Sequence, residues 1–539
     1  MAQNPWWQGA VIYQIYPRSF QDTNGDGIGD IKGIINKLDY IKSLGVDAIW
    51  VSPFFKSPMK DFGYDISDYR DIDPMFGSLD DFDTLIAQAH QRDIKLIIDQ
   101  VLSHTSNEHD WFVQSRTDKN NDKADWYVWA DAKPDGSAPN NWLSIFGGSA
   151  WQWEPRRCQY YLHNFLTEQP DLNFHNPEVR QAVLDNVEFW LNRGVDGFRL
   201  DAINFCYHDA QLRDNPAKPK ELRQGRGFSE DNPYAFQYHH YNNTQPENLA
   251  FMQEIRQLLD RYPGAVSLGE ISSEDSLKTM AEYTADGNKL HMGYSFELLT
   301  NDYSAAYIRE TVTKLEQEMT QGWPCWAFSN HDVERVASRW SASNHPIPEQ
   351  ATMLSALLAS LRGSICVYQG EELGLGEADV AFSDLQDPYG ITFWPTFKGR
   401  DGCRTPMPWQ SQAAFSGFST HTPWLPLCQE HTACSVEQQL TEPNSTLQLF
   451  SHFMAWRKTM PTLMFGDIEF IDTQEPILAF YRSYQGARTL CVFNLDATEQ
   501  TLELMLPAPQ QQTDLRHNTG LYDGDSITLS GYGCFIANV

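Results

Sequence analysis

Residues 176–203 read Asn176-Pro-Glu-Val-Arg-Gln-Ala-Val-Leu-Asp-Asn-Val-Glu-Phe-Trp-Leu-Asn-Arg-Gly-Val-Asp-Gly-Phe-Arg-Leu-Asp-Ala-Ile203, and they predict a helix followed by a buried strand. Asn176 can cap the helix, Pro177 suits its first position, and Gly194 ends it in the left-handed conformation. The apolar residues of the helix fall on one face: Val179, Val183, Val187, Trp190 and Leu191. The apolar run 197–203 is typical of a strand that is buried on both faces, hence of a parallel sheet.

The same strand–helix alternation extends over most of the chain. Two further helical stripes are Ile34, Ile35, Leu38, Ile41 and Leu44, and Phe82, Leu85, Ile86 and Ala89. The eight strand-like runs are Val11–Pro17, Ala48–Pro53, Lys95–Val101, Gly197–Ile203, Val266–Ile271, His291–Phe296, Pro324–Asn330 and Ser364–Glu372. Eight alternations predict a (β/α)8 TIM barrel. The alternative, a doubly wound open sheet, lacks a G-x-G-x-x-G motif after its first strand.

Three stretches interrupt the alternation and set the expected domain boundaries. Residues 104–174 are polar, rich in Trp and too long for a plain loop, so we expect an inserted subdomain after the third strand. Residues 373–409 form a second insertion, after the eighth strand. The barrel then comprises residues 1–103 and 175–459. From residue 460 to 539 alternating strands and turns predict an antiparallel β domain.

Composition excludes several classes of function. Lys and Arg total 40 against 71 Asp and Glu, and this net charge of −31 argues against binding to nucleic acid or to anionic lipid. The nine Cys are scattered without a C-x-x-C pair, which favours a reducing compartment. No signal peptide or membrane-spanning stretch is visible, so we expect a cytoplasmic protein, as a monomer or homodimer.

Charged and polar residues gather where the predicted strands end, which is where active sites of such barrels lie. They are Tyr64, Asp65, Asp99, His104, Arg199, Asp201, Glu270, His331 and Asp332. Several carboxylates converge there without a Lys or Cys nucleophile, and carboxylate pairs are the machinery of glycoside cleavage. Arg199 lies two residues before Asp201, on the same side of its strand, and is expected to keep that carboxylate ionised.

The motifs resemble those of glycoside hydrolase family 13, the α-amylase family, and within it the bacterial α-glucosidase and oligo-1,6-glucosidase branch. The similar stretches, in the family's order, are Trp6–Phe20, Asp99-Gln-Val-Leu-Ser-His104, Gln169-Pro-Asp-Leu-Asn173, Gly197-Phe-Arg-Leu-Asp201, Gly269-Glu270, Ser329-Asn-His-Asp332 and Gly399–Trp409. The resemblance implies that Asp201 is the nucleophile, Glu270 the general acid/base and Asp332 the acid that stabilises the transition state. It also implies that Tyr64, Asp65, His104, Arg199, His331 and Arg400 line the glucose pocket.

Two positions depart from the family pattern. The residue before His104 is usually Asn and is Ser103 here. The residue after the nucleophile is often Val or Thr in the branch and is Ala202 here. In that branch a Val goes with α-1,6 preference, so Ala202, near the acceptor side, indicates a preference for α-1,4 linkages.

The loop Asp22-Thr-Asn-Gly-Asp-Gly-Ile-Gly-Asp30 alternates oxygen ligands with glycines, which suits a hard cation. It begins like an EF-hand but has Gly33 where a bidentate Glu is required. It resembles the metal loop of the α-glucosidase branch. That resemblance implies a structural Ca²⁺, with Mg²⁺ as the alternative, held by Asp22, Asn24, Asp26, the Ile28 carbonyl and Asp30.

The function expected from the resemblance is an exo-acting, retaining α-glucosidase. Its substrates would be maltose and short malto-oligosaccharides, with some transglucosylation. The alternatives are an oligo-1,6-glucosidase and a dedicated transglucosylase or isomerase that uses the same covalent intermediate. A non-catalytic relative of transporter subunits is disfavoured, because Asp201, Glu270 and Asp332 are all present.

Overall fold

The computed structural model describes residues 4–223, 231–343, 345–506, 510–511 and 515–539. Its centre is an eight-stranded parallel sheet in the order β11-β10-β9-β5-β2-β1-β13-β12. A parallel bridge between Gly293 and Pro324 joins the two edge strands and closes the barrel. The strands are β1 (Val11–Ile15), β2 (Ala48–Val51), β5 (Lys95–Val101), β9 (Gly197–Asp201), β10 (Val266–Ile271), β11 (Met292–Ser295), β12 (Cys325–Ala327) and β13 (Ser364–Tyr368). The predicted barrel is confirmed, and the open-sheet alternative is wrong.

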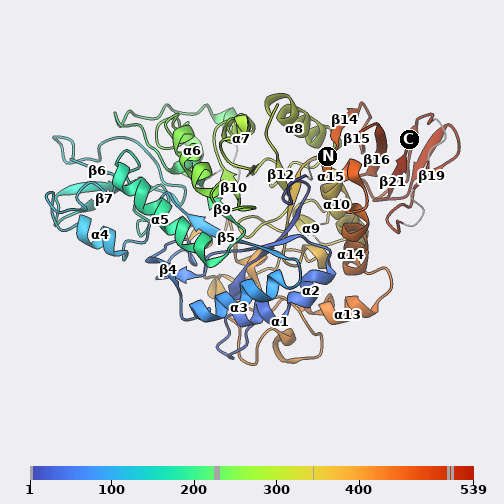
Figure 1. The fold of residues 1–539 in the computed structure, drawn as a ribbon, viewed down its shortest axis with the longest axis horizontal. Coiled ribbons are helices and arrows are strands. Elements are labelled where there is room, and N and C mark those ends of the chain that lie inside the picture. Colours follow the sequence, from blue (N-terminus) through green and yellow to red (C-terminus); the bar gives the residue numbers. More distant parts are fainter. Residues whose placement is uncertain (1–3, 224–230, 344, 507–509, 512–514) are drawn as a thin grey trace.

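Helices surround the barrel and follow its strands (Figure 1). Asn176 caps α5 by accepting a hydrogen bond from the Glu178 amide, and Gly194 ends the helix at φ 102°. The stripe predicted over residues 34–44 forms two helices instead of one, because Lys37 leaves the helical conformation at ψ 6°. The helices of the barrel are α1 (Ile31–Asn36), α2 (Leu38–Ser43), α3 (Leu79–His90), α5 (Pro177–Arg193), α6 (Asn248–Leu259), α7 (Ser276–Thr284), α8 (Ala305–Glu318), α9 (Val336–Arg339) and α10 (Pro348–Ser360).

The long segment after β5 contains α4 (Asp110–Ser115) and a small antiparallel sheet. Its strands are β6 (Trp129–Ala130), β7 (Trp151–Glu154) and β8 (Gln159–Leu162), in the order β6-β8-β7. This sheet covers a core of its own, in which Trp142 and Trp151 stack at 5.8 Å between ring centroids. A separate two-stranded sheet, β3 (Phe55–Lys56) with β4 (Asp68–Ile72), follows β2.

The C-terminal part is antiparallel, as predicted. One sheet has the order β14-β15-β16-β21-β18 and the other β17-β20-β19. Their strands are β14 (Asp467–Ile471), β15 (Ile477–Tyr484), β16 (Ala487–Asn494), β17 (Gln500–Glu503), β18 (Gln510–Gln511), β19 (Leu521–Tyr522), β20 (Ser526–Leu529) and β21 (Cys534–Asn538). Helices α11 (Pro388–Phe393), α12 (Gln429–Ala433), α13 (Val436–Thr441), α14 (Thr446–Arg457) and α15 (Pro461–Phe465) connect the barrel to them. Figure 1 shows the C-terminal sheets and the segment after β5 on opposite sides of the barrel.

A buried arginine fixes the C-terminal part to the barrel. Arg482 of β15 donates to the carbonyls of Ser360 and Leu361, at 2.6 and 2.9 Å. These carbonyls lie at the C-terminal end of α10, where helix carbonyls lack partners within the helix. The interface therefore satisfies backbone groups that would otherwise be buried without hydrogen bonds. Among the described residues, no helix combines the length and the apolar character needed to cross a membrane.

Candidate active site

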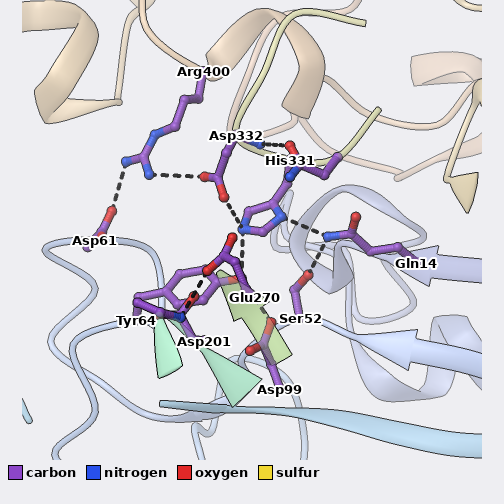
Figure 2. A network of polar contacts seen from close by, with 12 residues as sticks. Gln14, Ser52, Asp61, Tyr64, Asp99, Asp201, Glu270, His331, Asp332 and Arg400 are labelled. Carbon is purple, nitrogen blue, oxygen red and sulfur yellow. Dashed lines mark hydrogen bonds and ion pairs between the residues drawn. The ribbon is translucent and has the colours of Figure 1, made fainter. Parts of the chain in front are cut away.

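The predicted site residues come together at the carboxyl ends of the barrel strands, as parallel strands require (Figure 2). Asp201 ends β9, Glu270 lies near the end of β10, and Asp332 follows β12. A small cavity of about 100 Å³ opens between these three carboxylates. Its other lining residues are Asp61, Tyr64, His104, Ile145, Phe146, Phe165, Gln169, Ala202, Phe205, Ser272, Phe296, Tyr389 and Arg400.

Arg199 organises the floor of this cavity. Its Nη1 donates to Asp201 Oδ1 at 2.5 Å and to Asp99 Oδ1 at 3.0 Å. Its Nη2 pairs with Glu270 Oε1 at 2.6 Å and donates to the Tyr294 hydroxyl at 2.8 Å. The guanidinium is completely buried and therefore does not line the cavity itself. The two nitrogens of one planar group thus hold Asp201 and Glu270 side by side.

Burial raises the pKa of both carboxylates that Arg199 holds. Burial raises the pKa of Glu270 to about 8, and the charges of Asp201 and Asp332 add to this while Arg199 opposes it. Burial also raises the pKa of Asp201, to about 7, despite Arg199. Arg199 lowers the pKa of Asp201 against burial, but its single charge is shared with Asp99 and Glu270, so the expectation that it keeps Asp201 ionised stays a prediction. Burial thus favours a protonated Glu270, as an acid/base role requires.

Asp332 lies in a cationic setting. Its Oδ1 accepts hydrogen bonds from Arg404 at 3.1 Å and Arg400 at 3.3 Å, and its Oδ2 lies 3.3 Å from His331 Nε2. Burial works to raise its pKa, but His331 and the two arginines outweigh burial and hold the pKa well below its usual range. Of the three acids Asp332 has the most exposed side chain, at 22%. Arg400 and Arg404 thus favour the ionised form of Asp332, which lines the cavity.

Arg400 links two distant loops at the cavity wall. Its Nη2 donates to Asp61 Oδ1 and to Asp387 Oδ1, at 2.8 Å each. Gln169 Nε2 reaches Asp61 Oδ2 at 3.2 Å and lies the same distance from His104 Nε2. These polar groups offer fixed donors and acceptors to a hydroxylated ligand.

Asp65, one of the predicted pocket residues, does not face the cavity. It is completely buried, and its oxygens accept from the amides of Lys60 and Asp61 and from the hydroxyl of Ser57, at 2.8–3.0 Å. The carboxylate that lines the cavity is Asp61, which the sequence reasoning missed. The loop holds two aspartates four residues apart, and only the fold shows which one turns inward.

Three other predicted residues lie at the site, but only two of them line the cavity. His104 lines the cavity, and Ser103 Oγ contacts its Nδ1 at 3.0 Å, so the serine supplies a partner where the family has Asn. His331 is completely buried behind Tyr64, which stacks on it at 5.3 Å. Ala202 lines the cavity in a left-handed conformation, φ 39° and ψ 45°, and its amide donates to Glu270 Oε2 at 3.0 Å.

Sequence reasoning also missed Tyr294, Asp387 and Arg404. Tyr294 binds Arg199 and donates to Glu270 Oε1 at 3.2 Å. An isolated Tyr in an apolar run is usually part of a core, so nothing in the sequence of its strand marks Tyr294 as a site residue. Arg404 belongs to the same predicted motif as Arg400, and that motif was the available signal.

The predicted metal loop is held together by its own hydrogen bonds. Asp22 accepts from the amides of Asn24, Gly25 and Gly27, at 2.8–3.0 Å, and from Ser419 Oγ. Asp30 accepts from the amides of Thr23 and Gly33, at 2.7–2.8 Å. In the described part of the chain, no three His, Cys, Asp or Glu side chains converge as a metal-binding group. Calcium binding by the set Asp22, Asn24, Asp26, Ile28 and Asp30 stays a prediction.

Comparisons with known proteins agree with this geometry. The model of the α-amylase catalytic domain matches residues 14–466. A probable α-glucosidase of Rhizobium meliloti is 52% identical over 99% of this chain and 97% of its own length. The oligo-1,6-glucosidase of Parageobacillus thermoglucosidasius is 37% identical over 93% and 92% of the two chains. A crystal structure of the α-glucosyl transfer enzyme XgtA is 66% identical, with a TM-score of 0.98 over 99% of this chain and 100% of that one.

Proposed function

The chain belongs to the α-amylase family of glycoside hydrolases, and we propose that it is a retaining α-glucosidase that removes single glucose units from short α-glucosides. One observation carries the proposal: Asp201 and Glu270 are held on the two terminal nitrogens of one buried guanidinium. Retaining glycosidases need carboxyl groups about 5–5.5 Å apart, whereas inverting ones need room for a water between them. The shared contact of both carboxylates with adjacent nitrogens of Arg199 supports the shorter spacing.

The proposed reaction has two steps. In the first, Asp201 attacks the anomeric carbon while Glu270 protonates the departing glycosidic oxygen, which leaves a glucosyl ester on Asp201. In the second, Glu270 takes a proton from an incoming hydroxyl, and that oxygen displaces Asp201. The anomeric centre is inverted twice, so the α configuration is retained. Asp332, held ionised by Arg400 and Arg404, is placed to stabilise the positive charge that develops on the sugar.

The incoming hydroxyl belongs either to water or to a second sugar or alcohol. The 66% identity to an α-glucosyl transfer enzyme supports substantial transfer beside hydrolysis. Exo action is supported by the Arg400 ion pairs with Asp61 and Asp387, which tie the loop before β4 to the segment after β13 beside the cavity. We also propose α-1,4 preference, from Ala202, and a cytoplasmic location, from the nine free cysteines. Assembly as a monomer or homodimer stays a prediction.

An NMR time course on maltose, isomaltose, sucrose and trehalose tests the function. We expect α-glucose as the first product, maltose cleaved faster than isomaltose, and transfer products at high substrate concentration. An initial β-glucose product contradicts the double displacement, and faster cleavage of isomaltose supports the oligo-1,6-glucosidase alternative. Transfer products without free glucose support the dedicated transglucosylase.

Two substitutions test the roles. Asp201→Asn removes the nucleophile and is expected to lower kcat by at least about 10³-fold on every substrate. Glu270→Gln is expected to slow maltose far more than p-nitrophenyl α-glucoside in the first step, because only maltose has a poor leaving group. Activity near wild type in either variant removes that residue from its proposed role. Circular dichroism and melting temperature serve as the folding control for both.

A further inference from the structure

Gln14 lies in β1, on the barrel interior and outside the cavity that binds substrate. Its side chain is completely buried, and its Nε2 contacts His331 Nδ1 at 2.7 Å and Ser52 Oγ at 3.2 Å (Figure 2). Sequence reasoning gave Gln14 no role, and the reaction proposed above does not use it. Its amide is nevertheless the polar partner of a histidine that contacts Asp332 and Tyr64.

The orientation of the amide decides what Gln14 does to His331. With Nε2 toward His331, both amide hydrogens are used, one on His331 Nδ1 and one on Ser52 Oγ. Gln14 Oε1 is buried and has no hydrogen-bond partner among the described residues, so the opposite orientation would place both amide hydrogens where no acceptor lies. A buried donor without an acceptor costs about 1–3 kcal/mol, so the orientation with Nε2 toward His331 is favoured. His331 Nδ1 is then an acceptor, and the imidazole hydrogen is on Nε2.

The other end of the network leads to the same tautomer. The single hydroxyl hydrogen of Tyr64 is donated to Asp99 Oδ2 at 2.9 Å. Tyr64 then accepts at its second contact, 2.6 Å from His331 Nε2, and Asp332 Oδ2 lies 3.3 Å from the same nitrogen, so a hydrogen on Nε2 serves both neighbours. Asp99 in turn shares Arg199 Nη1 with Asp201. Two independent lines of evidence thus assign the hydrogen to Nε2.

We propose that Gln14 is a positioning residue: it holds His331 in the Nε2–H tautomer and so sets the direction of the hydrogen bonds that run through Tyr64 to Asp99. With that direction, Asp99 receives the Tyr64 hydrogen bond and competes less strongly with Asp201 for Arg199 Nη1. This deepens the proposed function and rests on it, because the end of the network is the residue assigned as nucleophile.

Three variants separate this role from packing. Gln14→Glu has almost the same shape, but an ionised carboxylate only accepts, so it favours a hydrogen on Nδ1 and forces Tyr64 to turn its hydrogen from Asp99 to His331. Gln14→Met keeps the length and removes both hydrogen bonds. Ser52→Ala, the matched control, removes the other partner of Gln14 without touching His331. We expect kcat on p-nitrophenyl α-glucoside to fall at least about tenfold in Gln14→Glu and a few-fold in Gln14→Met. It should change less than twofold in Ser52→Ala.

The tautomer itself is measured by ¹⁵N NMR on histidine-labelled protein, with His331→Asn to identify the signal by difference. We expect a protonated Nε2 in the wild type and Ser52→Ala, and a loss of that state in Gln14→Glu. A hydrogen on Nδ1 in the wild type overturns the proposal, as does a Gln14→Glu variant with wild-type tautomer and kcat. This measurement needs no substrate, so it remains decisive if the enzyme does not cleave α-glucosides. Gln14→Met gives a second reading if Gln14→Glu does not fold.

Discussion

At the scale of single residues, Asp61 and Asp65 are two carboxylates of one loop with different structural roles. Asp61 binds Arg400 and faces the cavity, whereas Asp65 accepts three hydrogen bonds from its own loop. Burial raises the pKa of Asp65 to about 6, against the stabilising effect of those hydrogen bonds. A carboxylate that holds a loop is expected to affect stability, and one that faces the cavity is expected to affect affinity.

Asp61→Asn is therefore expected to raise KM for maltose and to lower kcat/KM by about 10–100-fold, since hydrogen bonds to charged groups contribute about 1.5–3 kcal/mol. Its melting temperature should stay close to that of the wild type. Asp65→Ala is expected to do the reverse, with a melting temperature lowered by several degrees and a nearly unchanged KM. Equal effects of the two substitutions on KM would contradict this division of tasks. Steady-state kinetics and differential scanning calorimetry provide the comparison.

Ala202 connects linkage preference to backbone conformation. It has φ 39°, a region that β-branched residues rarely occupy. Its amide also donates to Glu270 Oε2, so a shift of this backbone moves the acid/base. A side chain added here would meet both the acceptor sugar and its own backbone.

We expect wild-type enzyme to prefer maltose over isomaltose, and Ala202→Val to shift the ratio of the two kcat/KM values toward isomaltose by about 5–30-fold, equivalent to 1–2 kcal/mol. Total activity should also fall, because Val is strained at positive φ. Ala202→Gly is the matched control: it relieves the strain, adds no methyl groups and should keep the maltose preference. If Val leaves the ratio unchanged, this position does not set linkage, and the loops around residues 204–250 become the next region to test.

At the scale of elements, the barrel strands were predictable because burial on both faces leaves continuous apolar runs. Their ends were less so: the runs expected at Ala48–Pro53 and Ser364–Glu372 stop at Val51 and Tyr368. The apolar spacing continues across Lys37 to Leu44, so the sequence pattern does not predict the break between the two helices. Asp61 was missed for a different reason. Its partner Arg400 is 339 residues away, and no local pattern records such a contact.

The loop after β1 is the element whose role stays open. It packs on residues 418–424, where Phe418 O accepts from the Asp22 amide and Gly27 O accepts from the Trp424 amide, at 2.9 and 3.0 Å. Trp424 lies 6.4 Å from the Tyr16 ring, which stacks on His331. The loop is therefore connected to the active site through packed rings, without contributing a ligand to the cavity.

If the loop binds Ca²⁺, chelation should lower the melting temperature. The free energy of unfolding should fall by RT ln(1 + [L]/Kd), which is about 2.7 kcal/mol when the free Ca²⁺ concentration is 100 times Kd. The kcat of the enzyme that stays folded should be unchanged. Asp26→Ala should reproduce the effect and abolish the response to added Ca²⁺. Elemental analysis that finds no metal, together with no thermal shift, would mean that the hydrogen bonds within the loop suffice.

At the scale of the whole molecule, two sets of buried groups set the pH range of stability. Burial raises the pKa of Asp171, Glu371 and Glu377 to about 8. These carboxyls contribute fully to the folded state below their unfolded pKa, near 4, and this contribution is lost progressively as the pH rises from 4 to 8. Burial lowers the pKa of His208 to about 3 and that of His431 to about 4. Their contribution is complete above pH 6.5 and is lost as the pH falls through 4.

The two sets oppose each other between about pH 4 and 6.5, and above pH 6.5 only the carboxyls still titrate, so the melting temperature should fall between about pH 6.5 and 8. This loss of the carboxyl contribution is added to the self-repulsion of a chain with a net charge of −31. Salt should reduce only the self-repulsion. Asp171→Asn removes one titrating group while keeping an acceptor for the Asn164 side chain, which donates to Asp171. Its melting temperature should therefore decline less between pH 6.5 and 8 than that of the wild type, by up to about 1.4 kcal/mol per pH unit in free energy. Parallel alkaline curves for the two proteins at high salt would show that Asp171 is already ionised in the fold, and that repulsion alone limits stability there.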